Sequence, residues 1–499
     1  MNLDALLLSR IQFAFVVSFH IIFPAFTIGL AAWLATIEGM RLATGNPIYR
    51  RLFDFWLKVF ALSFGMGVVS GIVMAFQFGT NWSVLAERTG PIQGPLLGYE
   101  GFTAFMLEAT FFGVMLLGRD RTPLWLYFLS CCMVSLGTML SSFWILCNNS
   151  WMQVPLGHTA VDGKLVPADW WTITTGPIVR LRWPHMLLAA FLTTGMSVIA
   201  TGAWYVVRRT YPDEGRVMLH WGLGLVAVII PVQLFIGHLN GKYVVQYQPS
   251  KIAAIEARWH DEKPASEVLL AWPDVANRRN LFAITLPPPF GSLIDSDSLS
   301  AAEVGLESIP RENWPPVVIP FFAFRIMVGM GLIMLAVSWF GVWLRFRGRL
   351  ETTRWFLWVA FLSFPTGFVA VLAGWFTAEV GRQPWVVYGL LRTKDAVTPS
   401  LTTGDVAFSL IAYIVVYVTI YSFGFYYIYR CCGTGRRSKW LPPCRERQGP
   451  VHCAGVGHEC NRALQPGPVL GCCHRPRDPR LCDPGRLRPR RRHPVRDDR

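Results

Sequence analysis

The stretch VLAGWFTAEVGRQPWV (residues 371–386) combines the composition of a membrane helix with two charges at its end. An apolar run comes first, and Glu379, Arg382 and Pro384 follow it in close succession. An ionisable side chain at membrane depth costs about 2.5–3.5 kcal/mol even on a lenient scale, and such residues usually mark functional sites. Proline cannot continue a helix, so we expect the chain to leave the membrane there. Something other than lipid must therefore surround Glu379 and Arg382.

The whole chain has the composition of an integral membrane protein. Of its 499 residues, 53% are hydrophobic and 15% are charged, and it contains 21 Trp and 34 Phe. Soluble globular domains carry about 25% charged residues, whereas membrane proteins concentrate aromatic residues at both water interfaces. The composition therefore excludes an ordinary soluble domain.

Nine apolar runs are long enough to cross a bilayer, which takes about 20 residues. They lie near residues 12–37, 56–79, 99–118, 124–146, 185–207, 217–239, 317–344, 355–378 and 405–429. The first run is too long for a cleavable signal peptide, and no small-residue cleavage site follows it. The predicted fold is an all-α integral membrane protein, a bundle of nine transmembrane helices with a long loop between helices six and seven.

The distribution of Lys and Arg predicts the orientation of the bundle. The loops after helices one, three, five and seven are richer in these residues than the short loops on the other side. Positively charged short loops stay in the cytoplasm, so the N-terminus is expected outside and the C-terminus inside. The chain then divides into helices one to six (1–239), an outer loop (240–316), helices seven to nine (317–430) and a cytoplasmic tail (431–499).

The tail, residues 431–499, is strongly basic, rich in Cys, Pro and Gly, and lacks apolar periodicity. Its Cys and His residues do not match the spacing of a tetrahedral zinc site. A basic tail at the inner face would also suit contact with anionic lipid. We interpret the tail as disordered, or as the product of a shifted reading frame in GC-rich DNA.

Few ionisable residues are expected at membrane depth. They are His20, Glu100, Glu108, His185, Arg325 and Glu379, to which His220 and His238 can be added. His20, in FVVSFHIIFPAF, is either a packing histidine bonded to a neighbouring helix or a haem or metal ligand, since neutral imidazole is the commonest metal ligand. His220 and His238 fit no ligand pattern, and we interpret them as ordinary polar residues.

Glu100 and Glu108 lie in LGYEGFTAFMLEATFFG and are a little over two helical turns apart. Both carboxylates are therefore expected near one face of the helix. Two carboxylates in a row suggest a proton route, which Asn149, Ser141 and Ser142 on the next helix would continue. The alternative is a pair of groups that hydrogen-bond between helices.

His185 opens helix five after RLRWP, and Met327 lies in FRIMVGMGLIM on helix seven. Taken singly, each residue is more often a structural side chain than a ligand. As a pair across the bundle they would give the His/Met ligation of a low-spin haem. Arg325, two residues before Met327, is suited to neutralise anionic haem propionates.

Six motifs, in order along the chain, resemble one protein family. They are GYEGFTAFMLEATF, WILCNNSWMQ, WPHM, YQPSKIAAIEA, FFAFRIMVGMG and GWFTAEVGRQPW, and the likeness runs from LLLSRIQFAFVVSFH to about Tyr429. The family is subunit I of the cytochrome bd quinol oxidases. The short span between KIAAIEA and FRIMVG resembles its cyanide-insensitive branch, which lacks a long insertion in the quinol loop.

The resemblance implies a role for most of these residues. His185 and Met327 match the axial ligands of a low-spin haem b. His20 and Glu379 match the ligands of two high-spin haems, one a haem b and the other a haem d or a further haem b, without deciding which residue holds which. Lys251 and Glu256 match the quinol-oxidation site. The other matches lie beside the haems or on the proton route: Trp375, Arg382, Glu100 and Glu108.

The function implied by the resemblance is a terminal quinol oxidase of a bacterial inner membrane. Quinol is oxidised at the outer face, dioxygen is reduced to water with protons from inside, and a membrane potential arises without a proton pump. The expected partners are a second membrane subunit (subunit II) and often a small single-helix subunit, with no copper and no nucleic acid. The alternatives are a di-haem membrane quinone reductase, which would need more histidines, and a proton-coupled transporter, which leaves His185 and Met327 unexplained. The quinone species and the installation of haem d stay open.

Overall fold

The computed structural model describes residues 4–434 and confirms the predicted nine transmembrane helices within that range. The nine spans are Ala5–Thr44, Pro47–Thr80, Ser83–Leu117, Leu124–Gln153, Trp170–Arg208, Pro212–Tyr247, Val318–Phe346, Arg354–Val380 and Thr403–Arg430. Residues 435–499, where most of the predicted tail falls, lie outside the described residues.

Six of the spans consist of one continuous helix each. They are α1 (Ala5–Thr44), α2 (Pro47–Thr80), α5 (Leu124–Gln153), α8 (Pro212–Tyr247), α11 (Val318–Phe346) and α14 (Thr403–Thr434). Local signals set their ends. Asp4 Oδ1 caps α1 by accepting a hydrogen bond from the Leu7 amide (2.7 Å). Gly45 ends α1 in the left-handed conformation, and Pro47 occupies the first turn of α2.

Three spans are interrupted. The third consists of α3 (Ser83–Tyr99), a π-helical turn (Glu100–Phe105) and α4 (Met106–Leu117). The fifth consists of α6 (Trp170–Thr175) and α7 (Pro177–Arg208). The eighth, predicted as one helix, is broken at residues 363–365 into α12 (Arg354–Leu362) and α13 (Thr366–Val380), because Pro365 cannot donate a backbone hydrogen bond. Such breaks in a membrane helix are typical of functional regions.

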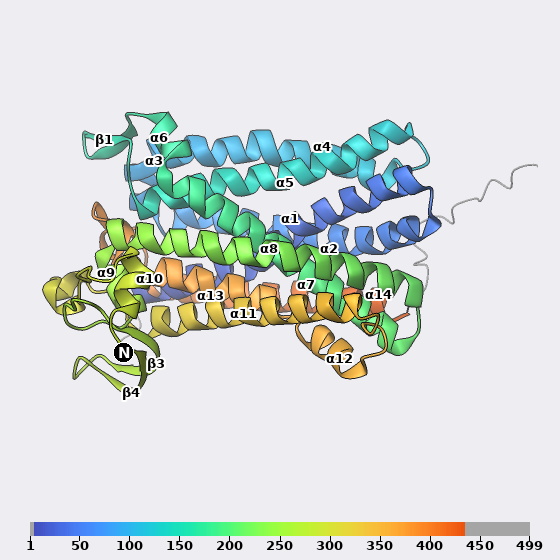
Figure 1. Ribbon diagram of the computed structural model, residues 1–499. Helices are drawn as coiled ribbons and strands as arrows, with labels where there is room; N and C mark the ends of the chain where they lie inside the picture. The colour runs from blue at the N-terminus through green and yellow to red at the C-terminus, as the bar shows by residue number, and fades with distance from the viewer. Residues whose placement is uncertain (1–3, 435–499) are drawn as a thin grey trace, which may run out of the picture. The chain divides into compact units, whose positions relative to one another are not determined.

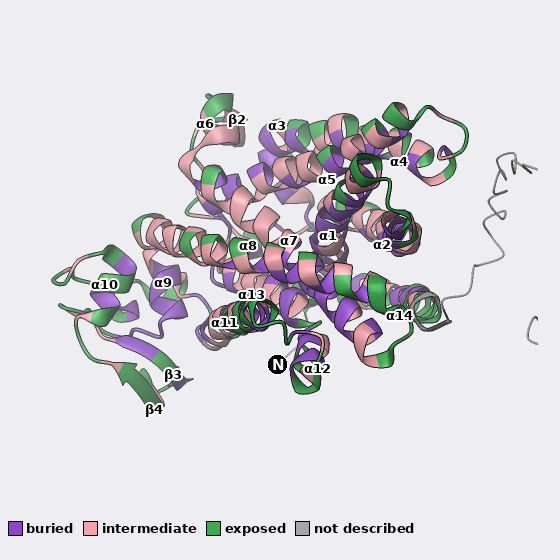
Figure 2. Cartoon of the chain, turned by 45° about the vertical axis from the view of Figure 1, so that its right-hand side comes forward, coloured by how far each residue is buried: buried purple, intermediate pink, exposed green. Residues whose placement is uncertain are grey.

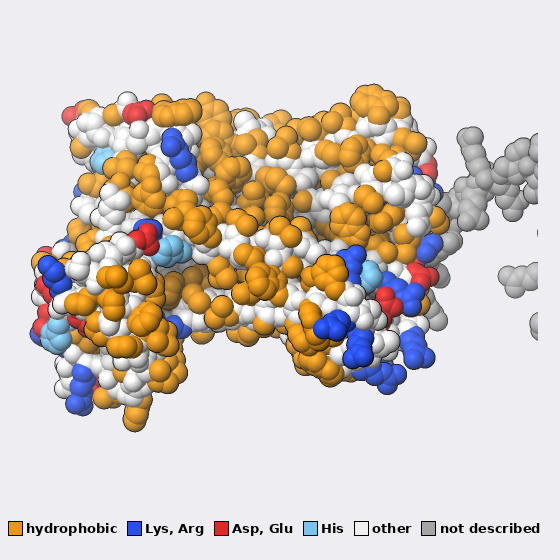
Figure 3. Space-filling view, viewed as in Figure 1, with side chains coloured by type: hydrophobic (Ala, Val, Ile, Leu, Met, Phe, Trp, Pro, Cys, Tyr) orange, Lys and Arg blue, Asp and Glu red, His pale blue; other side chains and the backbone are white. Residues whose placement is uncertain are grey.

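The helices α1 and α7 form the middle of the bundle, and their spans bury the largest share of side chains. Small residues allow close helix contacts: Gly29 of α1 lies against Thr194 of α7, and Gly202 of α7 against Gly215 of α8. At one end of the bundle, buried Glu38 of α1 pairs with Arg41 (2.7 Å) and Arg119 (3.1 Å). Hydrophobic side chains cover the middle of the face drawn in Figure 3, and charged ones gather toward its two ends.

Six of the described spans lie between the N-terminal residues and the segment between α8 and α11, and this even number places both at the same end, here called the N-terminal end (Figure 1). The short connections at this end are tied to one another through hydrogen bonds. The amide of Thr398 donates to Asn81 O (3.1 Å), the amide of Tyr388 donates to Met152 O (3.0 Å), and Tyr388 Oη lies 3.3 Å from Ser250 Oγ. The loops therefore form one structured layer over the ends of the helices.

The long loop between helices six and seven is itself folded. The helix α8 continues to Tyr247, so the loop spans 248–317 instead of the predicted 240–316. It contains α9 (Pro249–Ile255), an antiparallel pair β3 (Glu267–Asp274) and β4 (Arg279–Leu286), and α10 (Phe290–Ser296). Figure 2 shows α9 and much of β3 buried and most of β4 exposed.

The prediction of an all-α protein holds for the bundle but missed three small hairpins in its loops. Besides β3 and β4, they are β1 (His158–Val161) with β2 (Lys164–Pro167), and β5 (Trp385–Val387) with β6 (Leu391–Arg392). Each pair is antiparallel and lies outside the membrane spans, where loop backbone needs hydrogen-bond partners.

Candidate functional site

Glu379, near the end of α13, is the centre of a buried polar cluster. Its Oε1 accepts hydrogen bonds from Asn149 Nδ2 (2.9 Å) and Gln153 Nε2 (3.0 Å), both on α5. Its Oε2 pairs with the Nη2 of Arg382 on the following turn. Arg382, three residues after Glu379 in the sequence, is thus its ion-pair partner. Asn149, predicted as part of a proton path from Glu100, instead contacts Glu379.

Two further cations join this cluster from other elements. The Nη2 of Arg182 on α7 donates to Asn149 Oδ1 (2.7 Å). The Nζ of Lys251 on α9 donates to Gln153 Oε1 (3.0 Å) and to Gln248 Oε1 (3.2 Å). Burial, together with the nearby Arg182 and Arg382, lowers the pKa of Lys251 well below its ordinary value. We call these residues the Glu379 cluster: Glu379, Arg382, Asn149, Gln153, Arg182, Lys251 and Gln248.

Cations outnumber carboxylates in the Glu379 cluster. Among the described residues, it brings the guanidinium groups of Arg182 and Arg382 to one carboxylate, besides the Lys251 amine with its lowered pKa, and the Nε and Nη1 atoms of buried Arg382 have no hydrogen-bond partner. Buried charges that lack a counter-charge are costly. The cluster is therefore suited to an additional anionic group, such as the propionates of a haem.

His185 on α7 and Met327 on α11 each lie against a glycine. A Cβ added at Gly237 of α8 would come within 3.2 Å of His185 Cε1, and one at Gly374 of α13 would come within 2.9 Å of Met327 Sδ. The Nδ1 atom of His185 is buried without a hydrogen-bond partner within the described chain. Trp375, next to Gly374, is half-buried on α13. A ring nitrogen of His185 is thus left without a hydrogen bond from the described chain, as a metal ligand requires.

His20 on α1 contacts α2. Its Nδ1 lies 3.0 Å from Ser70 Oγ, and its ring packs against Gly71, where a Cβ would come within 3.1 Å of Cε1. Ser70 Oγ donates to the carbonyls of Met66 and Gly67 (3.0 Å each). When the single Ser70 proton is directed at one of these carbonyls, Oγ can accept a hydrogen bond from Nδ1–H of His20. This tautomer leaves Nε2 with a lone pair, the arrangement found in metal-bound histidines.

Glu100 and Glu108 both face α5, in keeping with their predicted common side. Ser141 Oγ donates to Glu100 Oε1 (3.0 Å), and Glu108 packs over Gly137, where a Cβ would clash with Glu108 Cγ at 2.6 Å. Glu108 is 5% exposed, and its Oε1 has no partner among the described residues. Ser142 instead accepts from Trp183 Nε1 (3.1 Å). A π-helical turn begins at Glu100, which the sequence motif did not predict. Such turns are rare and frequently lie at functional sites.

Arg325 does not have the free donors that its predicted contact with a haem propionate requires. Its Nη2 pairs with Glu256 Oε2 (2.9 Å) and with Val268 O. Its Nε donates to Leu269 O (3.0 Å), and its Nη1 donates to Ile255 O (2.7 Å) and Phe321 O (3.2 Å). All five N–H groups of the guanidinium are thus engaged. We correct the prediction: Arg325 joins α11 to the long loop.

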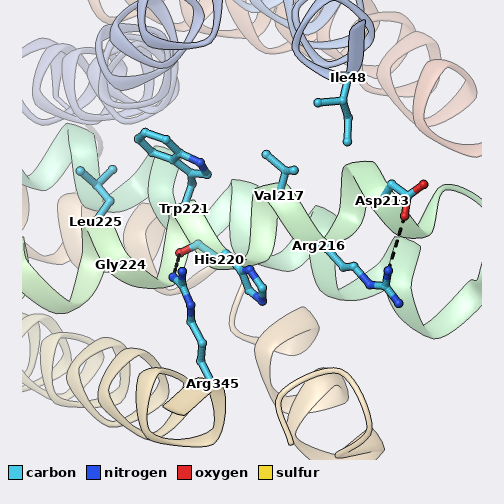
Figure 4. A pocket seen from close by; sticks show the side chains of 9 residues that line it. All are labelled: Ile48, Asp213, Arg216, Val217, His220, Trp221, Gly224, Leu225 and Arg345. Atoms are coloured by element: carbon cyan, nitrogen blue, oxygen red, sulfur yellow. Dashed lines mark hydrogen bonds and ion pairs between the residues drawn. The ribbon is translucent and has the colours of Figure 1, made fainter. Parts of the chain in front are cut away.

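The two histidines that fitted no ligand pattern lie apart from the Glu379 cluster. His220 lines an open pocket of about 770 Å³ between α8 and α11, where Arg345 Nη1 donates to the His220 carbonyl (3.4 Å; Figure 4). His238 Nε2 lies 3.3 Å from Asp297 Oδ1. These contacts do not change their interpretation as ordinary polar residues.

The comparison with protein families identifies the family of this chain. Residues 8–436 match the family described as cytochrome bd terminal oxidase subunit I. The chain belongs to the cytochrome bd terminal oxidase subunit I family. It is therefore a subunit of a haem-containing terminal oxidase of the respiratory chain, an oxidoreductase and an integral membrane protein.

Individual relatives agree with this family. The chain is 35% identical over 432 residues to the cytochrome bd ubiquinol oxidase subunit 1 of Bacillus subtilis (strain 168), covering 84% of this chain and 91% of the relative. It is 32% identical over 484 residues to the cytochrome bd-II ubiquinol oxidase subunit 1 of Escherichia coli (strain K12), covering 83% and 93%. The bd oxidase structure from Geobacillus thermodenitrificans matches with a TM-score of 0.79 and 26% identity, covering 86% and 99%.

Several residues of the cytochrome bd chain that contribute to the clusters were not singled out from the sequence. Gln153 and Arg182 belong to the Glu379 cluster, and Glu267, Arg258 and Asp295 lie buried in the long loop. The spacing of Asn149 and Gln153, one helical turn apart in CNNSWMQ, was a usable signal for the first group. The loop residues carry no such signal, because their contacts join segments far apart in the sequence.

Proposed function

We propose that this chain contains the quinol-oxidation site and the haems of a membrane quinol oxidase that reduces dioxygen to water. The observation that carries the proposal is the Glu379 cluster: one carboxylate held by α5 amides, with an excess of buried cations, in a chain of the cytochrome bd family. A helix bundle that only spans the membrane would not need such a cluster, because burying cations without an anion is costly.

The residues available as ligands fit three haems. We propose His185 and Met327 as the axial ligands of a low-spin haem b, and His20 and Glu379 as ligands of two high-spin haems. One of these is a haem b and the other a haem d or a further haem b, without copper. Support comes from the free Nδ1 of His185, the Ser70 contact that leaves His20 Nε2 available, and the two unpartnered nitrogens of Arg382. Trp375 would lie beside the high-spin pair.

The haems, when bound, supply the electron carriers and the iron at which oxygen is reduced. The chain's own residues hold quinol and move protons. Lys251 and Glu256, at the start and the end of α9, are proposed to bind quinol, and Glu256 is held by Arg325 (2.9 Å). Each quinol releases two protons and two electrons, so two quinols supply the four electrons that one dioxygen needs. Glu100 and Glu108 are proposed to carry protons from the opposite side.

The orientation follows from the distribution of Lys and Arg. We propose that the N-terminal end, with the loop 248–317, faces outside and that the C-terminus faces the cytoplasm of a bacterial cell. Protons are then released outside and consumed from inside, which builds a membrane potential without a pump. The division into helices one to six, outer loop, helices seven to nine and tail is proposed on the same basis. The short-loop branch, a subunit II partner and a small single-helix subunit are proposed from the resemblance to the family.

A reduced-minus-oxidised visible spectrum of the purified membrane protein tests the proposal. Haem bands are expected, and His185→Ala or Met327→Leu should remove the low-spin component and quinol oxidation, since loss of an axial ligand opens the site. Met334→Leu, a buried methionine further along α11, is the matched control and should leave the spectrum intact. A normal low-spin band in both ligand variants would refute the assignment, and the absence of haem would favour a transporter.

A further inference from the structure

The long loop 248–317 buries a second charged cluster, here called the loop acid cluster: Glu256, Glu267, Asp295, Glu303, Arg258 and Arg325. Its four acids come from four segments: the end of α9, β3, α10 and the stretch after α10. Their exposed fractions are 4%, 7%, 6% and 3% for Glu256, Glu267, Asp295 and Glu303. Four buried acids and two arginines cannot all be ionised without an uncompensated negative charge.

Three of the four acids have a partner. Glu256 pairs with Arg325 (2.9 Å), Asp295 pairs with Arg258 (2.9 Å), and Glu303 accepts from Ser296 Oγ (2.6 Å). Glu267 differs from them, because its Oε2 is buried without a hydrogen-bond partner in the described part of the chain. Glu267 is thus the acid of this cluster that has a buried oxygen without a partner among the described residues.

Glu267 lies within hydrogen-bonding reach of Glu256. Two adjacent buried carboxyl groups do not both ionise, so we infer that this pair holds one proton. Burial first, and the neighbouring Glu256 next, raise the pKa of Glu267 to about 9. Burial also raises the pKa of Asp295 to about 6 despite Arg258. The pair therefore presents a carboxylate, Glu256, backed by a protonated acid, Glu267.

We propose that Glu267 carries protons released by quinol away from Glu256 and toward Asp295. The inference rests on the proposed function, since Glu256 is taken there as part of the quinol site. When a quinol O–H bond breaks, its proton goes to the Glu256 carboxylate and the bonding pair stays on the quinol oxygen. The quinol is oxidised by losing one electron for each proton to the haem acceptor of the oxidase. The pair then holds two protons, and Glu267 gives up its own toward Asp295. Asp297, two residues further on and exposed, is next to water.

The charged groups that face Glu267 come from each element packed against it. They are Glu256 from the end of α9, Arg325 from α11 and Asp295 from α10, with Arg258 bound to Asp295. Both arginines are held by partners of their own, so they favour ionisation of Glu256 and Asp295 more than that of Glu267. This arrangement leaves an acid with a retained proton between two ionisable neighbours, which is what a relay requires.

The test compares Glu267→Gln with Glu267→Asp in the whole oxidase. Gln keeps the size of the side chain but cannot transfer a proton, so quinol-driven turnover should fall by about tenfold or more, and its pH profile should change. Turnover fed by an artificial one-electron donor should stay normal. Glu267→Asp should regain part of the loss. Glu312→Gln, an exposed acid of the same loop, is the control and should have no effect.

Infrared spectroscopy gives a readout that does not depend on turnover. At neutral pH the carbonyl-stretch band of a protonated carboxylic acid should decrease in Glu267→Gln relative to the unaltered protein. No change in that band, or an unchanged quinol turnover and pH profile, would overturn the proposal. Equal losses with both donors would also overturn it, because they would mean a structural role. If the unaltered oxidase lacked haem or quinol turnover, the proposed function would fail, while the infrared band would still decide whether Glu267 holds a proton.

Discussion

The Glu379 cluster and the loop acid cluster lie at the same end of the bundle and have opposite charge balances. Among the described residues, the first sets Arg182, Lys251 and Arg382 against one carboxylate. The second sets four acids against two arginines. Buried charge must be neutralised, so the first cluster is built for an anionic group and the second for protons. The charge that each cluster lacks therefore indicates what it binds: an anionic group in the Glu379 cluster and protons in the loop acid cluster.

Gln153 contacts both Glu379 and Lys251, and it connects the Glu379 cluster to the helix that leads to the loop acid cluster. Gln153 donates from Nε2 to Glu379 and accepts at Oε1 from Lys251, whose helix α9 ends at Glu256 of the loop acid cluster. An amide suits this position because one of its ends donates and the other accepts. The two clusters are thus linked through α5 and α9 while keeping opposite charges.

The largest effect is expected from removing the single carboxylate of the cation-rich cluster. Glu379→Ala should lower oxidase activity by about 100-fold or more, with loss of a high-spin haem signal, since ligand and counter-charge are removed together. Glu38→Gln is a matched control, because Glu38 is a buried acid paired with arginines at the other end of the bundle. Spectra and activity together check this, and a Glu379→Ala protein with a full haem spectrum would contradict it.

A smaller effect is expected from Lys251, which belongs to one cluster and adjoins the other. Lys251→Met keeps most of the side-chain volume but removes two hydrogen bonds to glutamine oxygens. Quinol kcat/KM should fall by about tenfold, which corresponds to one charged hydrogen bond. Turnover with an artificial one-electron donor should change little. Equal losses with the two donors would mean that Lys251 supports only the fold.

Gln153 tests the link between the clusters. Gln153→Leu should lower quinol turnover by about three- to tenfold, because Lys251 and one lone pair of Glu379 lose a buried partner. Gln153→Glu keeps the acceptor for Lys251 but replaces the donor to Glu379, so its loss should appear mainly in the haem spectrum. Steady-state kinetics and spectra of both variants distinguish the two contacts. Identical behaviour of the two variants would argue against separate roles for the two ends of the amide.

The last prediction concerns the pH dependence of the stability of the acid-rich loop, where no effect on turnover is measured. A raised pKa means that the folded loop holds a proton on Glu267 that the unfolded chain has lost, from about pH 4.5 to about pH 9. Stability is therefore greatest below this range and decreases as pH rises through it, by at most about 1.4 kcal/mol per pH unit for one proton. Hydrogen exchange of loop amides should show this slope, and Glu267→Gln should flatten it. A slope that persists in the variant would assign it to other groups.

The bundle could be predicted from the sequence because its signals are local. Apolar runs of sufficient length predict membrane helices wherever they occur, and nine of them were found in the described chain. The breaks at Glu100 and at residues 363–365 were missed, since a π-helical turn and a proline-induced break lie inside apolar runs that read as continuous. The folding of the loop was missed as well, because β3 pairs with β4 under a cover of residues from distant segments.

The sequence by itself determined the membrane class, the family motifs and the individual residues suited to ligation or proton transfer. Hydropathy and rare intramembrane charges can be recognised one segment at a time, because the cost of burying a charge in lipid does not depend on the fold. Only the tertiary structure decided which charges meet. Arg325, predicted beside haem propionates, pairs with Glu256, Asn149 contacts Glu379, and Glu267 lies beside Glu256. Pairing of buried charges acts over a few ångströms, so it depends on contacts between residues far apart in the chain.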